Sequence, residues 1–160
     1  HLGFIYWRLK QFDKAAEIYE RGAKIPGAPQ FLGLMAAKMR SEGGSRETAR
    51  AIYRQTLENA ADSQTAEAAA LRLLELDSLD ERDAIRAALK NFKEKTGRCA
   101  NSWREIFPLL QNVKLPNDRD FSIDKSNNLV DPGGAPYVLD KEICDVKLDG
   151  KITKIPFNNF

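Results

Sequence analysis

One spacing constrains the fold of this chain more than any other feature. Ala15 and Tyr19 recur as Ala49 and Tyr53, an offset of 34 residues in both cases. A fixed period of about 20 to 50 residues is typical of stacked repeats, in which each unit buries its apolar face against the next one. The spacing therefore predicts an array of similar helical units at the start of the chain.

The first unit has the pattern of a helical hairpin. Apolar residues at helical spacing predict a helix over residues 2–9. The polar Lys10-Gln11 step interrupts it, and a second helix is expected over residues 13–24, before the Pro26-Gly27 step.

Two further hairpins are expected, and the pattern weakens along the chain. The second covers residues 29–60, and the third covers residues 66–96, with Asp77-Ser78 as its turn and Gly97 as its end. The third rests on the spacing of apolar residues alone, so we interpret it as the cap of the array. The expected fold is mainly α, with about three hairpins over residues 1–97 and a small α+β extension over residues 98–160.

The first hairpin resembles the tetratricopeptide signature, W-x2-L-G-x2-Y followed by A-x3-F and a closing proline. The second hairpin repeats it in weaker form, because Ala36-Ala37 stands at the Leu-Gly position and Arg40 stands at the aromatic position. The residues that carry the resemblance are Leu2, Gly3, Tyr6, Ala15, Tyr19 and Pro26, with Ala49 and Tyr53 in the second copy. The resemblance implies a protein-binding module with a concave face formed by the first helix of each hairpin.

Five residues are candidates for partner binding on that concave face. They combine aromatic and basic side chains, a mixture that is typical of interface anchors. They are Phe4, Trp7, Arg8, Lys38 and Arg40. The alternative is that Phe4 and Trp7 pack against an earlier part of the same array.

After Gly97 the composition changes to one that predicts a mixed α/β structure. A helix is expected over residues 101–111, followed by a loop and a turn at residues 131–134. Three strands are expected next, over residues 136–139, 144–148 and 151–155, with Asp149-Gly150 as a hairpin turn between the last two.

The tail resembles a segment that follows the repeats in uncharacterised bacterial tetratricopeptide proteins, which tend to be exported or membrane anchored. The runs GRCANSWREIFP and DPGGAPYVLD carry this resemblance, and the second run is more distantly similar to a turn of type II secretion pseudopilins. Cys99 and Cys144 are a matched departure from such sequences. The resemblance therefore favours a disulfide between them and an extracytoplasmic location, with two unrelated buried thiols as the alternative.

Composition and chain ends limit the possible function classes. The net charge of +2 and the mixing of basic with acidic residues argue against a nucleic-acid partner. No stretch approaches the roughly 20 apolar residues of a membrane span. The chain begins with His1 instead of Met, and we interpret it as processed or truncated, with further repeats or a membrane anchor as candidates for what precedes it.

The sequence offers few of the residue combinations that catalysis needs. His1 is the one histidine, so nucleophile–histidine pairs and histidine metal sites are not expected, and Cys99 has no evident base. We therefore expect no enzymatic activity and no cofactor. Four loop aspartates are a weak calcium candidate, although the EF-hand pattern is absent and a polar surface loop is the favoured alternative. They are Asp118, Asp120, Asp124 and Asp131.

Two functions follow from the resemblance. The first is a non-enzymatic subunit that scaffolds a larger bacterial complex or drives its oligomerisation. The alternative is a transient adaptor or chaperone that binds an extended peptide in the concave groove.

Overall fold

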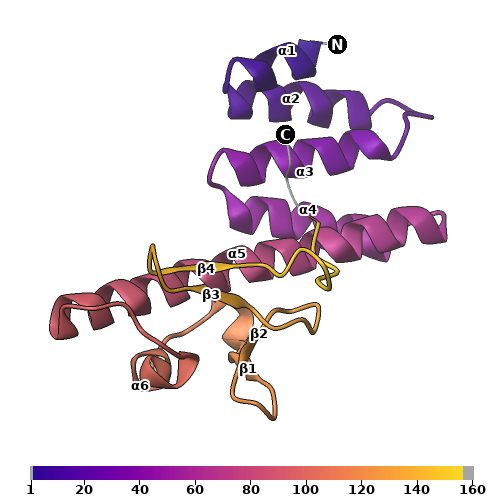
Figure 1. Cartoon of the computed structure of the whole chain (residues 1–160). Coiled ribbons are helices and arrows are strands. Elements are labelled where there is room, and N and C mark those ends of the chain that lie inside the picture. The colour runs from indigo at the N-terminus through magenta and orange to yellow at the C-terminus, as the bar shows by residue number, and fades with distance from the viewer. Residues whose placement is uncertain (1, 157–160) are drawn as a thin grey trace. The chain divides into compact units, whose positions relative to one another are not determined.

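The computed structural model of the chain describes residues 2–156. The chain is mainly helical, with two short antiparallel sheets in its last third (Figure 1). It divides into two compact units, residues 1–76, here called the helical unit, and residues 77–160, here called the tail unit. This division lies inside a helix, well before the boundary expected at residues 97 and 98.

The elements of the helical unit are α1 (Leu2–Arg8), α2 (Phe12–Ala23), α3 (Phe31–Glu42), α4 (Arg46–Glu58) and the first part of α5 (Ser63–Thr96). In this unit, α1 packs on α2, α2 on α3, and α3 on α4, as successive antiparallel helices (Figure 1). The two expected helices of the first hairpin are thus confirmed within a few residues.

Local signals separate these helices. Lys10, with φ of 55°, turns the chain between α1 and α2, and Gly27, with φ of 78°, lies between α2 and α3. Gly44, with φ of 89°, follows the end of α3. Glycine adopts a positive φ without the steric strain that other residues incur. Gly27 and Gly44 therefore allow the chain to leave one helix and turn toward the next.

The expected third hairpin is wrong. One helix, α5, runs from Ser63 to Thr96 without interruption, through the Asp77-Ser78 step that we expected to be a turn. Neither residue breaks a helix as glycine or proline does, and Ser78 is fully buried, with its hydroxyl 2.9 Å from that of Tyr137. The helix ends before Gly97, which has φ of 76°, as the sequence predicts.

The core of the tail unit forms around the second part of α5. Ile85 and Leu89 of α5 pack with Trp103 and Ile106 and with residues of the later strands, all of them buried. The helix expected over residues 101–111 is broken into a 3₁₀ turn, η1 (Trp103–Glu105), and the single turn α6 (Phe107–Leu110). Pro108 lies in the first turn of α6, where its missing N–H is tolerated. A further 3₁₀ turn, η2 (Pro116–Asp118), follows.

Two separate antiparallel hairpins complete the tail unit. Strands β1 (Ser122–Ile123) and β2 (Leu129–Val130) form the first, in a region that we expected to be loop. Strands β3 (Val138–Asp140) and β4 (Asp145–Lys147) form the second and match two of the expected strands.

The third expected strand, residues 151–155, is wrong. The Asp149-Gly150 turn does form, because Ile152 N–H and Thr153 N–H both donate to the Asp149 carbonyl. The Thr153 hydroxyl then donates to Asp131 at 2.6 Å, and this bond directs the chain toward the 131–134 turn instead of along β4. The expected turn at 131–134 is present, with Gly134 N–H bonded to the Asp131 carbonyl.

A polar cluster lies buried beside this core. Glu81 is 2% exposed, and its carboxylate accepts hydrogen bonds from the hydroxyl of Tyr137 and from Nη1 of Arg119, both at 2.8 Å. Nη2 of Arg119 donates to the Asp77 carbonyl at 3.2 Å. Burial raises the pKa of Glu81, because an uncharged carboxyl is favoured away from water.

Hydrogen bonds from Arg86 also join α5 to strand β4. Arg86 Nε donates to Asp145 Oδ1 at 2.7 Å, and its Nη2 donates to the Val146 carbonyl at 3.4 Å. The Val146 N–H donates to Asp145 Oδ1 at 2.7 Å. Both backbone polar groups of Val146 are therefore occupied.

Candidate functional site

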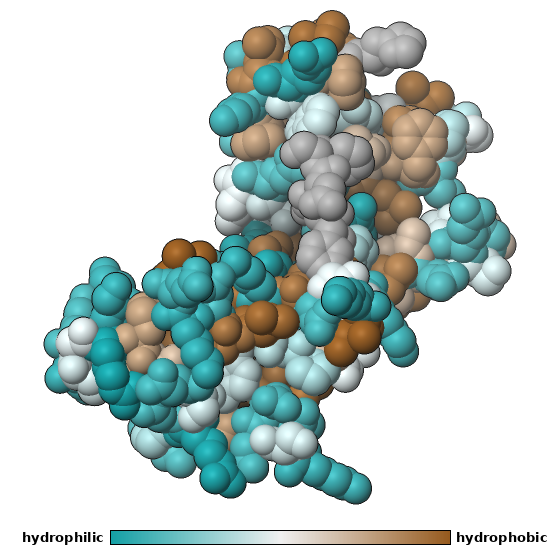
Figure 2. Space-filling model, viewed as in Figure 1, coloured by the Kyte–Doolittle hydropathy of each residue, from teal (hydrophilic) through white to brown (hydrophobic). Residues whose placement is uncertain are grey.

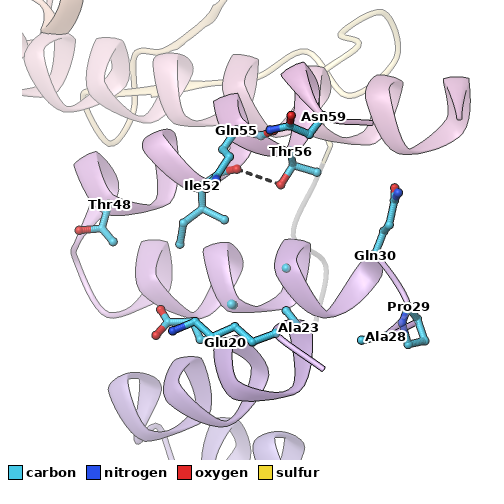
Figure 3. Close-up of a pocket in the computed structure, with 13 residues that line it drawn as sticks. Glu20, Ala23, Ala28, Pro29, Gln30, Thr48, Ile52, Gln55, Thr56 and Asn59 are labelled. Atoms are coloured by element: carbon cyan, nitrogen blue, oxygen red, sulfur yellow. Dashed lines mark hydrogen bonds between the residues drawn. The ribbon is translucent and has the colours of Figure 1, made fainter. Parts of the chain in front are cut away.

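The helical unit contains an open groove of about 650 Å³ between α2 and α4, here called the α2–α4 groove (Figure 3). This volume lies within the roughly 300 to 1,000 Å³ of typical ligand sites. Helix α2 and the loop after it supply Glu20, Ala23, Lys24, Ala28, Pro29 and Gln30. Helices α3 and α4, with the residue that follows α4, supply Gly33, Ala36, Thr48, Ile52, Gln55, Thr56 and Asn59.

The groove is hollow because α3 places small residues at its floor. A Cβ atom added to Gly33 would meet no other atom within 4 Å, so the space above this residue is open. Ala36, one turn further along, is 1% exposed. In Figure 3, Ile52 points from α4 toward α3, and Glu20 and Ala23 lie on the other side of α3.

Primary amides are the main hydrogen-bonding groups at the rim. The side chains of Gln30 and Gln55 are exposed, and neither bonds to another of residues 2–156. Asn59 uses its amide nitrogen to donate to the Gln55 carbonyl at 2.9 Å, which leaves its side-chain oxygen available. An amide both donates and accepts, so this rim suits a ligand that does the same.

The groove has two charged lining residues, and they differ in their surroundings. Glu20 accepts bonds from Nε and Nη2 of Arg40 at 2.9 and 3.1 Å, so its charge is compensated. The hydrogen bond to Glu20 in turn raises the pKa of Arg40. Lys24 is exposed and forms no ion pair within the described range 2–156. The groove therefore presents one uncompensated positive charge.

None of the five residues predicted to bind a partner lines this groove. Phe4 and Trp7 lie on α1 with ring centroids 5.4 Å apart, and Arg8 is exposed in the last turn of that helix. Trp7 Nε1 donates to Glu42 at 2.7 Å, and Lys38 lies 3.8 Å from the same carboxylate.

Arg40, the fifth predicted residue, is engaged within the helical unit. Besides its bonds to Glu20, its Nη1 donates to Asp13 at 3.0 Å. The guanidinium therefore joins α2 to α3, and its donors face acids of this chain.

The residues that carry the sequence resemblance to the tetratricopeptide signature have different surroundings in the structure. A Cβ atom on Gly3 would lie 2.7 Å from the ring of Tyr19, so only glycine allows α1 and α2 this approach. Tyr6 and Tyr19 pack against the core made by Ala15, Ala16 and Met39. In α4, the positions Ala49 and Tyr53 are both buried, and burial raises the pKa of Tyr53. Leu2 and Pro26, by contrast, are exposed.

The structure pairs the two cysteines. Cys99, just after α5, forms a disulfide with Cys144 in the β3–β4 turn, and their Cα atoms are 5.4 Å apart. Cys144 has a φ of 56°, a backbone conformation that is uncommon for residues other than glycine.

The four candidate calcium ligands have separate roles or none. Asp124 accepts from the N–H groups of Ser126 and Asn128, and Asp131 accepts from those of Gly133 and Ala135. Asp118 and Asp120 are exposed. Among residues 2–156, no three His, Cys, Asp or Glu side chains lie close enough together to hold a metal ion.

The sequence contained no signal for the α2–α4 groove. Its amides and Lys24 lie on faces that a helical pattern assigns to solvent, and its hollow depends on how three helices pack. No family model, curated protein or solved structure matches the chain.

Proposed function

We propose that the chain is a non-enzymatic protein-binding subunit that helps to assemble a larger bacterial complex, built on tetratricopeptide-like hairpins. The close approach of Gly3 to Tyr19 supports the hairpin interpretation. So does the burial of Ala15 and Ala49, which are one period apart in the second helices of successive hairpins.

One observation carries the assembly role, which is the apolar surface of α1. Leu2, Ile5 and Leu9 are 49%, 51% and 60% exposed, and Phe4 is 49% exposed. Hydrophobic atoms are visible at the end of the helical unit that carries α1 (Figure 2). Helical spacing places Leu2, Ile5 and Leu9 on one face and Phe4 on another, beside Trp7. An exposed apolar face of this kind marks protein interaction sites more often than single exposed side chains do.

The charges around this surface describe its partner. Arg8 and Lys10 are exposed at the C-terminal end of α1, beside Leu9. Complementary charge fixes the orientation of a complex and speeds its formation. The partner surface is therefore apolar at its centre and acidic at its edge.

The test is native purification of the whole chain followed by mass spectrometry, with the variant Ile5→Glu. A partner that survives high salt with the unchanged chain is expected to be lost with Ile5→Glu, because a carboxylate in the contact is repelled and desolvated. Ile152→Glu is the matched control, since Ile152 is 57% exposed in the tail unit. Retention of the partner by Ile5→Glu, or no stable partner at all, contradicts the proposal.

The α2–α4 groove favours a second candidate function. An open groove with an amide rim suits the transient capture of a peptide segment, as an adaptor or chaperone would perform it. This groove lies between the second helices α2 and α4, and not on the concave face of first helices that the tetratricopeptide resemblance implies. The α1 surface and the groove involve different residues, so the two functions are separately testable.

No helix within residues 2–156 combines the length and the apolar character that a membrane crossing requires. An extracytoplasmic location remains part of the proposal. The pairing of Cys99 with Cys144 supports it, because disulfides persist mainly in oxidising compartments.

A further inference from the structure

We infer that the α2–α4 groove binds an extended peptide segment that carries an acidic side chain. The inference rests on the second candidate function, peptide capture, and names the chemistry of what is captured. It is independent of the α1 surface.

The hydrogen-bonding groups of the groove favour an extended backbone over a helical one. Gln30 and Gln55 offer amides that bond to no other residue of the described chain, and Asn59 offers its side-chain oxygen. A helix uses its backbone N–H and C=O groups internally, whereas an extended segment leaves them free. The rim can therefore bond to an extended backbone along its length and has little to offer a helix.

The floor limits the size of the side chains that face it. Gly33 makes the open part of the floor, and Ile52 is the one large aliphatic residue of the lining. Small or medium apolar side chains fit above these residues, and no aromatic residue of the lining provides a stacking surface. The floor thus adds modest apolar contact to the hydrogen bonds of the rim.

Charge supplies the specificity. Lys24 is the lining cation without an ion-pair partner in residues 2–156, whereas Glu20 is compensated by Arg40. Lys24 follows the last residue of α2, and Gln30 precedes the first residue of α3, so both belong to the same inter-helix connection. Figure 3 shows Gln30 and Asn59 at one end of the groove and Thr48 at the other. We therefore place the acidic side chain of the peptide within reach of Lys24.

The test is a selection from a library of terminally blocked heptapeptides, randomised at every position, with the whole chain as bait. Enrichment of Asp or Glu at one position, among otherwise uncharged residues, is expected. The enriched peptide is then resynthesised with a fluorophore, and its dissociation constant is measured by fluorescence polarisation for the chain and its variants.

Three variants separate the possible outcomes. Gly33→Leu fills the groove and is expected to abolish binding without unfolding α3, because leucine is a better helix former than glycine. Lys24→Glu is expected to weaken binding at least about tenfold, since repulsion replaces attraction. Arg21→Glu is the matched control, because Arg21 is exposed on α2 outside the groove, and it is expected to change binding less than about twofold.

The outcomes distinguish this inference from the function on which it rests. Peptides that lose binding with Gly33→Leu but show no acidic preference overturn the inference and leave peptide capture standing. Peptides that bind Gly33→Leu unchanged, or the absence of any enriched peptide, overturn both. Selection of helix-forming apolar peptides overturns the extended-backbone inference.

Discussion

In the helical unit, helices that are neighbours along the chain pack through small residues, whereas in the tail unit residues far apart in the sequence converge on one stretch of α5. Ala15, Ala16 and Ala37 are fully buried in the first case. In the second case, the bond between Tyr137 and Glu81 joins residues 56 positions apart. Because the packing of the helical unit is local, its helices can be predicted from the sequence. The tail unit depends instead on a few specific contacts between residues that are far apart in the sequence.

The largest expected effect tests the disulfide of the tail unit. Replacing Cys99 and Cys144 with serine removes a cross-link between residues 45 positions apart. On the chain-entropy model, this is expected to lower the free energy of unfolding by about 4 kcal/mol. Urea denaturation measures the change, and hydrogen exchange is expected to show that residues 2–76 are little affected. An unchanged urea midpoint would show that the tail unit does not depend on this bond.

The next effect tests the buried ion pair. Arg119→Met leaves the carboxylate of Glu81 buried without its cation, and a loss of about 3 kcal/mol is expected. The double variant Glu81→Leu/Arg119→Met is expected to be more stable than Arg119→Met alone, because it removes the buried charge as well. If the single variant is the more stable of the two, Arg119 does not compensate Glu81.

A smaller effect tests the close packing of the helical unit. Gly3→Ala places a Cβ 2.7 Å from the Tyr19 ring, and a loss of about 1 kcal/mol is expected because the ring must shift. Gly33→Ala is the matched control, since its Cβ meets nothing within 4 Å, and a gain of about 0.5 to 1 kcal/mol is expected from helix propensity. Thermal unfolding compares them, and equal shifts would contradict the argument from packing.

The smallest effect concerns acid. The hydrogen bond from Arg98, followed by that from the Asn101 N–H, lowers the pKa of Glu105 to about 2. Because the folded-state pKa lies below its usual value of 4.5, the contribution of Glu105 to stability is complete above about pH 4.5 and is lost as the pH falls toward 2. Glu105→Gln is expected to reduce the drop in melting temperature across this window.

The matched group for this comparison is Glu81, whose pKa shifts in the opposite direction. Its raised pKa means that its contribution declines as the pH rises above 4.5. Comparing melting temperatures of the unchanged chain and Glu105→Gln at pH 6 and pH 3 isolates Glu105. An equal drop in both proteins would contradict the prediction.

The contrast between the units also explains which parts of the structure the sequence could predict. Helices α1 and α2 and the end of α5 followed from apolar spacing and from glycine, which are local signals. The turn predicted at Asp77-Ser78 was wrong because these residues occur in turns and in helices alike. The buried hydrogen bond between Ser78 and Tyr137 joins residues too far apart for a local sequence pattern to reveal it. The β1–β2 hairpin was missed because strands of two residues show no alternation.

The candidate site was beyond sequence reasoning for a related physical reason. Phe4 and Arg8 could be recognised as surface candidates by residue type, although their role stays a prediction. Arg40 is of a residue type that often anchors interfaces, yet its guanidinium donates hydrogen bonds to Glu20 and Asp13. The hollow above Gly33 arises from the spacing of helices, which no run of residues encodes by itself.

The bonds around Val146 bear on how the chain behaves when many copies meet. Exposed strand edges act as templates on which another chain can add a strand, and this addition is a common start of aggregation. At Val146 the N–H is bonded to Asp145 and the carbonyl to Arg86, so an incoming strand would find neither group free there. The side chains of Asp145 and Arg86 thus block strand addition at Val146, the most deeply buried residue of the three-residue strand β4.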